Sequence, residues 1–248
     1  MKIILASASP RRQELLKHIF KEFTVIPAKD EERAAFITPE QYVSDLAKGK
    51  AAEVALRCFS TDISDESFHS KNFFSPDSVT PEEADVSDNT FLIISADTIV
   101  YAQGTILGKP KDVDDAKRML GILSGDHHYV YTGVCTVMIN AAPTADHPDS
   151  IDHKTINEKS FIDNMDIRKV SYKTFSEKTK VFTDPLTIHE INEYIASGEP
   201  MDKAGSYGIQ GMFSRYINHI EGDYFNVVGL PVSRLYKELK SFLPFCID

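Results

Sequence analysis

The sequence predicts an α/β protein built on a mixed sheet. Apolar runs that are typical of strands alternate along the chain with amphipathic segments that begin at helix-capping residues. Some apolar runs are continuous, as in strands buried on both faces, whereas others alternate with polar residues. Because strands that alternate with helices build α/β sheets, we assign the chain to this class.

The first expected elements are a strand, a tight turn and a helix. Residues 2–6 form an apolar run, and Ser9 then stands as an N-cap before Pro10, the first residue of a helix that reaches about residue 20. A second strand is expected over residues 24–26. Thr38 opens a capping-box pattern for a long helix that extends to about residue 58.

The next element is a continuous apolar strand over residues 91–94, which runs into Ser95-Ala-Asp-Thr98. We expect this buried strand to end at Asp97, at the edge where open α/β sheets place their ligands. The remaining expected elements, in chain order, are a hairpin over 99–107 that turns at Gln103-Gly104, a helix over 112–123, strands over 128–139 and 170–182, and helices over 187–197 and 231–242.

Two stretches interrupt the pattern, at about residues 59–90 and 140–169. Both are polar and acidic and contain proline, so we expect insertions in a single domain that spans residues 1–248. Of the net charge of −10, −7 falls within residues 59–90. The acidic balance argues against binding to duplex nucleic acid or an anionic membrane. A small anionic ligand can still bind where basic residues make the surface locally positive.

Composition excludes several other classes of protein. With 42% hydrophobic and 26% charged residues, the chain as a whole is neither disordered nor fibrous. No apolar run approaches the roughly 20 residues that a bilayer requires, and residues 3–6 are too short for a signal-peptide core. Cys58, Cys135 and Cys246 lack C-x-x-C spacing, so we expect free thiols in a cytoplasmic protein rather than a disulfide framework or a zinc site.

One group of candidate functional residues lies at the start of the first helix. Ser7-Ala-Ser-Pro-Arg-Arg12 places two hydroxyls and two guanidiniums beside the unpaired N–H groups of a helix N-terminus, which suits a phosphate group. The alternative is an ordinary capped helix whose arginines face solvent.

Carboxylates form a second group. Asp97 could ligate a metal or act as a general base toward water, because both tasks need an ionised oxygen aimed at the reaction centre. It could instead cap the turn after the strand. Asp30, Glu31 and Glu32 could supply oxygen ligands to Mg²⁺ or Mn²⁺, although solvated loop charge is the commoner interpretation.

Lysines and a glycine-rich segment complete the candidates. Lys50 and Lys109 could each pair with phosphate oxygens, or could simply be solvated. Residues 198–211 contain four glycines, which indicates either close approach of the backbone to another group or a bulged strand with turns. Gln210 in this segment, and the hydroxyl of Thr98, offer groups that could read the edge of a base.

Taken together, these motifs resemble the Maf family of nucleotide pyrophosphatases. The resemblance covers residues 3 to about 240, apart from the two stretches that break the pattern. It rests on Leu5-Ala-Ser-x-Ser-Pro-Arg-Arg12, Lys50-Ala51, Ser95-Ala-Asp-Thr98, Gly108-Lys-Pro110, Leu123-Ser-Gly125, Thr132-Gly-Val134, Gly198-Glu-Pro-x-Asp-Lys-Ala-Gly-x-Tyr-Gly-Ile-Gln-Gly211 and Gly222-Asp-Tyr-x-Asn-Val-Val-Gly-Leu-Pro231.

The resemblance implies an elongated, inosine-triphosphatase-like α/β fold with two lobes around a central cleft. It further implies hydrolysis of a nucleoside triphosphate between the α and β phosphates, with a divalent cation, Mg²⁺ or Mn²⁺, as cofactor. The implied site residues are Asp97 as catalytic base and metal ligand, Glu31 as a second metal-side carboxylate, Ser9, Arg12, Lys50 and Lys109 at the phosphates, and Arg11, Thr98 and Gln210 at the base.

Arg11, Thr98 and Gln210 together resemble the branch of the family that acts on dTTP and UTP. One alternative is a non-catalytic, nucleotide-binding regulator of septation, against which the intact Asp97 and Lys109 argue. Another is a pyrophosphatase for modified purine nucleotides, which the three base-specificity residues disfavour. The resemblance leaves a homodimer open.

Overall fold

The computed structural model describes residues 1–29, 38–59, 90–143 and 165–242. Within these residues, seven strands form one mixed sheet in the order β2-β1-β3-β5-β6-β7, with β4 paired to β3. Strand β1 (Lys2–Leu5) is parallel to β2 (Thr24–Val25) and to β3 (Thr90–Ala102), and the other pairings are antiparallel. The predicted α/β class with a mixed sheet is therefore confirmed.

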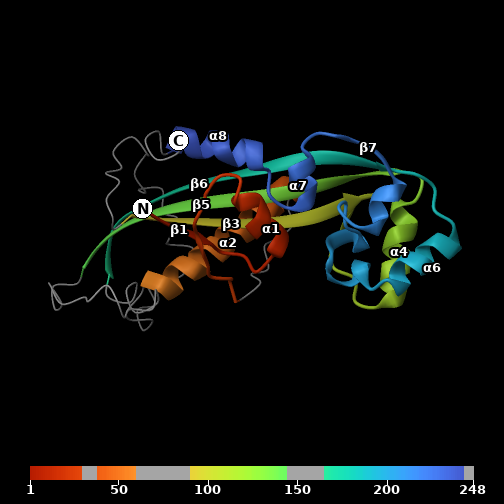
Figure 1. The fold of residues 1–248 in the computed structure, drawn as a ribbon, viewed down its shortest axis with the longest axis horizontal. Helices are drawn as coiled ribbons and strands as arrows, with labels where there is room; N and C mark the ends of the chain where they lie inside the picture. Colours follow the sequence, from red (N-terminus) through yellow and green to blue (C-terminus); the bar gives the residue numbers. More distant parts are fainter. Residues whose placement is uncertain (30–37, 60–89, 144–164, 243–248) are drawn as a thin grey trace.

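Three long strands run the length of the molecule and connect its two ends (Figure 1). They are β3, β5 (His127–Pro143) and β6 (Met165–Thr183). Strands β5 and β6 pair as far as Pro143 and Met165, so the prediction of an irregular stretch over 140–169 is wrong at both ends. Pairing between β5 and β6 holds these ends extended, which local composition does not reveal. Residues 60–89 and 144–164 lie outside the described residues.

The sequence predicted that the strand over residues 91–94 ends at Asp97, but strand β3 extends beyond it. It continues to Ala102 because β5 pairs with it residue by residue, with Asp97 opposite Gly133. On its other edge, β1 pairs with β3 only as far as Ile94, and β4 (Thr105–Leu107) begins to pair at Val100. Among the described strands, this edge of β3 therefore has a gap in its pairing, and Asp97 lies inside it.

Helices cover both faces of the sheet at the end that carries β1 and β2 (Figure 1). Helix α2 (Pro39–Phe59) packs on the face that contains Phe91 and Ile93. Helices α1 (Pro10–Leu16) and α8 (Val232–Phe242) pack on the opposite face, around Leu92 and Ile94. The alternation of side chains along β3 thus divides the core into two layers.

A second lobe caps the other end of the long strands (Figure 1). It contains α4 (Val113–Leu123), α6 (Ile188–Ala196), three short 3₁₀ helices and β7 (Ile217–Glu221). The 3₁₀ helices are η3 (Glu199–Asp202), η4 (Ala204–Ser206) and η5 (Met212–Tyr216). The predicted elongated fold with two lobes is confirmed.

Helix boundaries agree with the sequence signals except at the end of α1. Ser9, Asp112 and Thr187 are the N-caps of α1, α4 and α6, and Thr187 and Glu190 form the complete capping box. Helix α1 ends at Leu16, earlier than expected, and continues in turns. The five-residue helix α7 (Tyr224–Val228), capped by Asp223, is too short for a periodic signal and was missed.

Among the described residues, no helix is long and apolar enough to span a membrane.

Candidate active site

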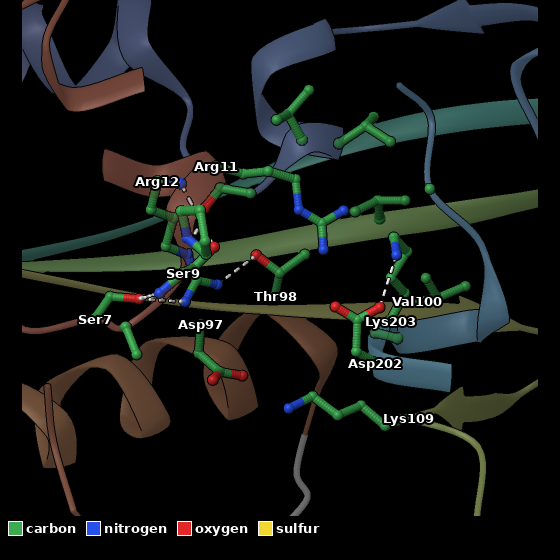
Figure 2. A pocket seen from close by; sticks show the side chains of 18 of the residues that line it. Ser7, Ser9, Arg11, Arg12, Asp97, Thr98, Val100, Lys109, Asp202 and Lys203 are labelled. Carbon is green, nitrogen blue, oxygen red and sulfur yellow. Dashed lines mark hydrogen bonds and ion pairs between the residues drawn. The ribbon is translucent and has the colours of Figure 1, made fainter. Parts of the chain in front are cut away.

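A cavity of about 440 Å³ opens at the gap in the pairing of β3, between the two lobes. Most of the residues singled out from the sequence line it, and Figure 2 shows several of them from close by. The predicted residues on its walls are Ser9, Arg11, Arg12, Lys50, Asp97, Thr98 and Lys109. Gln210 is exposed and is not among the lining residues, although its neighbours Gly208 and Ile209 are. Glu31 lies outside the described residues.

Asp97 forms an ion pair with Lys50, which reaches it from α2. The two side chains are only 16% and 18% exposed, so the charges face the cavity rather than bulk solvent. The close approach of α2 depends on Gly133, the strand partner of Asp97. A Cβ atom at Gly133 would lie 2.2 Å from the carbonyl oxygen of Val43 in α2, so this position requires glycine.

Arg12 is held by three acceptors on the opposite face of the sheet. Its Nε donates to the carbonyl oxygen of Gly229 at 2.9 Å, its Nη1 to Ser7 Oγ at 3.3 Å and its Nη2 to Thr98 Oγ1 at 3.0 Å. Burial lowers the pKa of the guanidinium from its ordinary value, but an arginine remains charged near neutral pH. One N–H on each terminal nitrogen has no acceptor among the described residues, so both remain available to a ligand.

Thr98 and Asp97 belong to opposite faces of β3, because successive side chains alternate across a strand. They nevertheless reach one cavity, since the gap in pairing leaves that edge of β3 open. Thr98 contacts Arg12 from α1, whereas Asp97 contacts Lys50 from α2. The open edge therefore brings both helices to the same ligand-sized space.

The wall formed by the second lobe carries Lys109, Asp202, Lys203 and Tyr207. Lys203 Nζ donates to Asp202 Oδ1 at 2.7 Å and to the carbonyl oxygen of Glu199 at 2.6 Å. The first of these bonds lowers the pKa of Asp202. Arg11 extends across the cavity toward this wall (Figure 2).

Tyr207 is anchored from behind by a buried histidine. Its hydroxyl lies 2.7 Å from His128 Nε2, and His128 is 1% exposed. Burial raises the pKa of Tyr207 and lowers that of His128 to about 3, so both are neutral at physiological pH. The pair is a structural support for this wall.

The glycine-rich segment folds around one of its own carboxylates. Glu199 accepts hydrogen bonds from Tyr194 Oη and from the backbone N–H of Met212, each at 2.9 Å. A Cβ at Gly211 would lie 1.9 Å from Glu199 Oε1. The close backbone approach is therefore to Glu199 at Gly211 and to Val100 at Gly205. The bulged-strand alternative is wrong, because 3₁₀ turns form there instead.

Comparison with known proteins identifies the family. A family model described as Maf-like protein matches residues 2–242. The chain belongs to the Maf family.

Related Maf chains match over almost their whole length. A dTTP/UTP pyrophosphatase of Agathobacter rectalis is 46% identical over 239 residues, which cover 96% of each chain. Proteins of the same name are 39% identical in Carboxydothermus hydrogenoformans, over 98% of this chain and 99% of the other, and 38% identical in Lachnoclostridium phytofermentans, over 97% and 94%.

Several cavity residues of this Maf chain had no role in the sequence prediction. Asp202, Lys203 and Tyr207 line the cavity, and Thr132 lies just behind it. The signal was present, because all four belong to the quoted family motifs. No local pattern distinguishes residues of a cavity wall from residues of an ordinary turn. Nor does the sequence show that the buried Thr132 is linked to Arg12 through Thr98.

The donor set of the cavity is compatible with a divalent cation. Within the described residues no three His, Cys, Asp or Glu side chains cluster as a metal site. Mg²⁺ typically binds one or two carboxylates together with substrate phosphates and water, so it does not need such a cluster. Asp97, the less exposed of the two cavity carboxylates, fits that requirement.

Proposed function

We propose that this Maf-family protein hydrolyses dTTP and UTP between the α and β phosphates, releasing the monophosphate and pyrophosphate. The observation that carries the proposal is the position of Asp97. It lies in the open edge of β3, with Lys50 beside it and Arg12 and Lys109 on walls of the same cavity. The names of the related proteins support dTTP and UTP as substrates.

The cations of the cavity suit a triphosphate. Lys50 uses one of its three N–H groups on Asp97, which leaves two for phosphate oxygens. Arg12 presents two further N–H groups from a fixed guanidinium, and Ser9 lies close to it at the start of α1. Lys109, on the opposite wall, has no ion-pair partner in the part of the chain that the structure describes. Positioned donors of this kind stabilise the charge that develops on a leaving pyrophosphate.

Asp97 is the group that orients and deprotonates the attacking water in this proposal. A carboxylate must be ionised to act as a general base and must lie within hydrogen-bond reach of the proton that it removes. Asp202 is less suited, because its side chain is 73% exposed whereas that of Asp97 is 16% exposed. A bound Mg²⁺ or Mn²⁺, held by Asp97 and, we propose, by Glu31, would neutralise phosphate charge and lower the pKa of water.

Base choice is assigned to Arg11, Thr98 and Gln210. An amide and a guanidinium can pair with the N3–H and carbonyl groups of uracil or thymine, whereas cytosine presents a different edge. Each polar group that a wrong base covers and leaves unpaired costs about 1–3 kcal/mol. Two such groups give a preference on the order of tens- to thousands-fold for dTTP and UTP over purine nucleotides, with CTP intermediate.

A substrate screen tests this proposal. Pyrophosphate release is measured as kcat/KM for dTTP, UTP, CTP, GTP and 7-methyl-GTP, with Mg²⁺ and with Mn²⁺. The expected order places dTTP and UTP first. Equal or better use of either guanine nucleotide would instead favour a purine pyrophosphatase, and tight binding of all nucleotides without turnover would favour a non-catalytic regulator.

A further inference from the structure

A chain of hydrogen bonds runs from Arg12 into the protein interior. Arg12 Nη2 donates to Thr98 Oγ1 at 3.0 Å, Thr98 Oγ1 lies 2.9 Å from Thr132 Oγ1, and Thr132 Oγ1 donates to the carbonyl oxygen of Asn226 at 3.0 Å. Thr98 and Thr132 are direct partners across β3 and β5. Thr132 has no exposed surface and does not line the cavity, so it has no direct access to a ligand.

Each hydrogen bond in this series from Arg12 to Asn226 can have only one direction. A hydroxyl has a single proton, and a carbonyl oxygen can only accept, so the Thr132 proton points to Asn226. The proton between the two threonines must then come from Thr98. Thr98 can consequently only accept from Arg12, which matches a guanidinium that can only donate. Thr132 therefore decides which way the Thr98 hydroxyl points.

Asn226, at the inner end of this series of hydrogen bonds, is itself held in place by further hydrogen bonds. Asn226 is fully buried in α7, and its Nδ2 donates to the carbonyl oxygen of Val130 and to Thr179 Oγ1, each at 3.0 Å. Three residues later, Gly229 supplies the carbonyl oxygen that accepts from Arg12 Nε. The segment around α7 thus fixes Arg12 twice, directly through Gly229 and indirectly through Thr132 and Thr98.

We propose that Thr132 is a positioning residue for the phosphate-binding arginine. By accepting the Thr98 proton it holds Thr98 as an acceptor and so aims the free N–H groups of Arg12 into the cavity. Without the Thr132 oxygen, the Thr98 proton is free to turn toward the cavity or toward the guanidinium, and in the second orientation Arg12 loses one of its three contacts. This inference rests on the proposed function, because it takes substrate phosphates as the ligand of Arg12.

The first experiment compares Thr132→Val, Thr132→Ser and a matched control, Thr136→Val. Thr136 is also a buried threonine on β5, facing the same side, and its hydroxyl donates to the carbonyl oxygen of Lys173. We expect Thr132→Val to lower kcat/KM for dTTP about tenfold, the loss of one hydrogen bond to a charged group, mainly through KM. Thr132→Ser should restore the value to within about threefold, since it keeps the hydroxyl. Thr136→Val should match the wild type, and equal losses in both valine variants would overturn the proposal.

A double-mutant cycle tests whether Thr132 acts through Thr98. We expect Thr98→Val to show a similar loss, and Thr132→Val to add nothing in the Thr98→Val background. Independent, additive losses would show that Thr132 acts by another route. Should Thr132→Val fail to fold, binding of tripolyphosphate by Thr98→Val decides, because this ligand has no base: about tenfold weaker binding supports the proposal, and unchanged binding overturns it.

Binding of inorganic tripolyphosphate separates this inference from the proposed function. Calorimetry on the wild type and on Thr132→Val measures phosphate affinity without turnover or a base, and we expect about tenfold weaker binding in the variant. A wild type that binds tripolyphosphate but hydrolyses no nucleotide would contradict the proposed function alone. Active wild type with equal tripolyphosphate affinity in the variant would contradict the role of Thr132 alone.

Discussion

The two walls of the cavity use their polar groups differently. On the wall formed by β1, α1 and α2, Arg12 and Lys50 are held by protein acceptors and still have N–H groups left for a ligand. On the wall of the second lobe, Lys203 is bonded to Asp202 and Tyr207 to His128. Lys109 is the cation of that wall without an ion-pair partner among the described residues.

The difference teaches that the two walls suit different parts of one ligand. A triphosphate needs several cations with unused donors, which the first wall supplies. A nucleoside needs apolar surface with a few fixed polar groups, and the second wall offers Tyr207 and Ile209 beside its neutralised charge pair. We therefore expect the phosphates along α1 and α2, with Lys109 reaching them from the opposite wall, and the nucleoside toward the rest of the second lobe.

The largest expected effect distinguishes the two cavity carboxylates. Asp97→Asn removes charge with little change in volume, and loss of a general base typically lowers kcat by about 10²- to 10⁴-fold while substrate still binds. Asp202→Asn, on the other wall, should change kcat by less than about tenfold, because Asp202 lies away from the proposed reaction and is bonded to Lys203. Steady-state kinetics of pyrophosphate release measures both. An Asp97→Asn enzyme that keeps more than half of the wild-type kcat would remove Asp97 from this role.

A second change breaks the first wall through packing. Gly133→Ala would force α2 away from β5, and overpacking of this kind costs about 1–3 kcal/mol in unfolding free energy. The shift also moves Lys50 from Asp97, so kcat should fall together with the melting temperature.

Gly121→Ala is the matched control for this substitution. Gly121 lies in α4, and a Cβ there would meet no atom within 4 Å. Alanine should therefore be neutral or should stabilise the helix by up to about 1 kcal/mol. Wild-type melting temperature and activity in Gly133→Ala would refute the close-packing argument.

A third prediction concerns the support of the second wall, where the expected effect is on stability alone and depends on pH. The folded protein holds the pKa of His128 at about 3, below its ordinary value of 6.5, because the ring is buried. Between these two pH values the unfolded state binds more protons, so stability falls as the pH decreases. From pH 7 to pH 5 the contribution of His128 amounts to a loss of about 2 kcal/mol.

Urea unfolding at pH 7 and pH 5 measures this contribution. His128→Gln should flatten the pH dependence relative to the wild type, because the amide can hydrogen-bond to Tyr207 in either direction but does not titrate. His127→Gln is the matched control, since His127 is the adjacent exposed histidine on β5. Equal slopes in His128→Gln and the wild type would show that His128 is not kept neutral by the fold.

Local sequence determined the starts of helices and the identity of most cavity residues. Ser9, Asp112 and Thr187 cap their helices through hydrogen bonds to backbone groups at most three residues away, which a sequence pattern can show. The cations and Asp97 were recognisable because charged groups near buried strands and helix starts need a partner or a ligand. The grouping of Ser9, Arg12, Lys50 and Lys109 around Asp97 was available only as an implication of the family resemblance.

Only the tertiary structure decided where these groups meet. Asp97 lies within a continuous strand because β5 pairs with β3 from Thr90 to Tyr101. At Asp97 and Gly133 this pairing joins residues more than thirty positions apart. The cavity exists because β1 stops pairing before β4 begins, so side chains from both faces of β3 reach one space. Gln210, in contrast, follows the lining residues in the chain but is not part of the described wall of the cavity. Strand ends and open edges are set by hydrogen bonds between distant segments, and no local pattern carries that information.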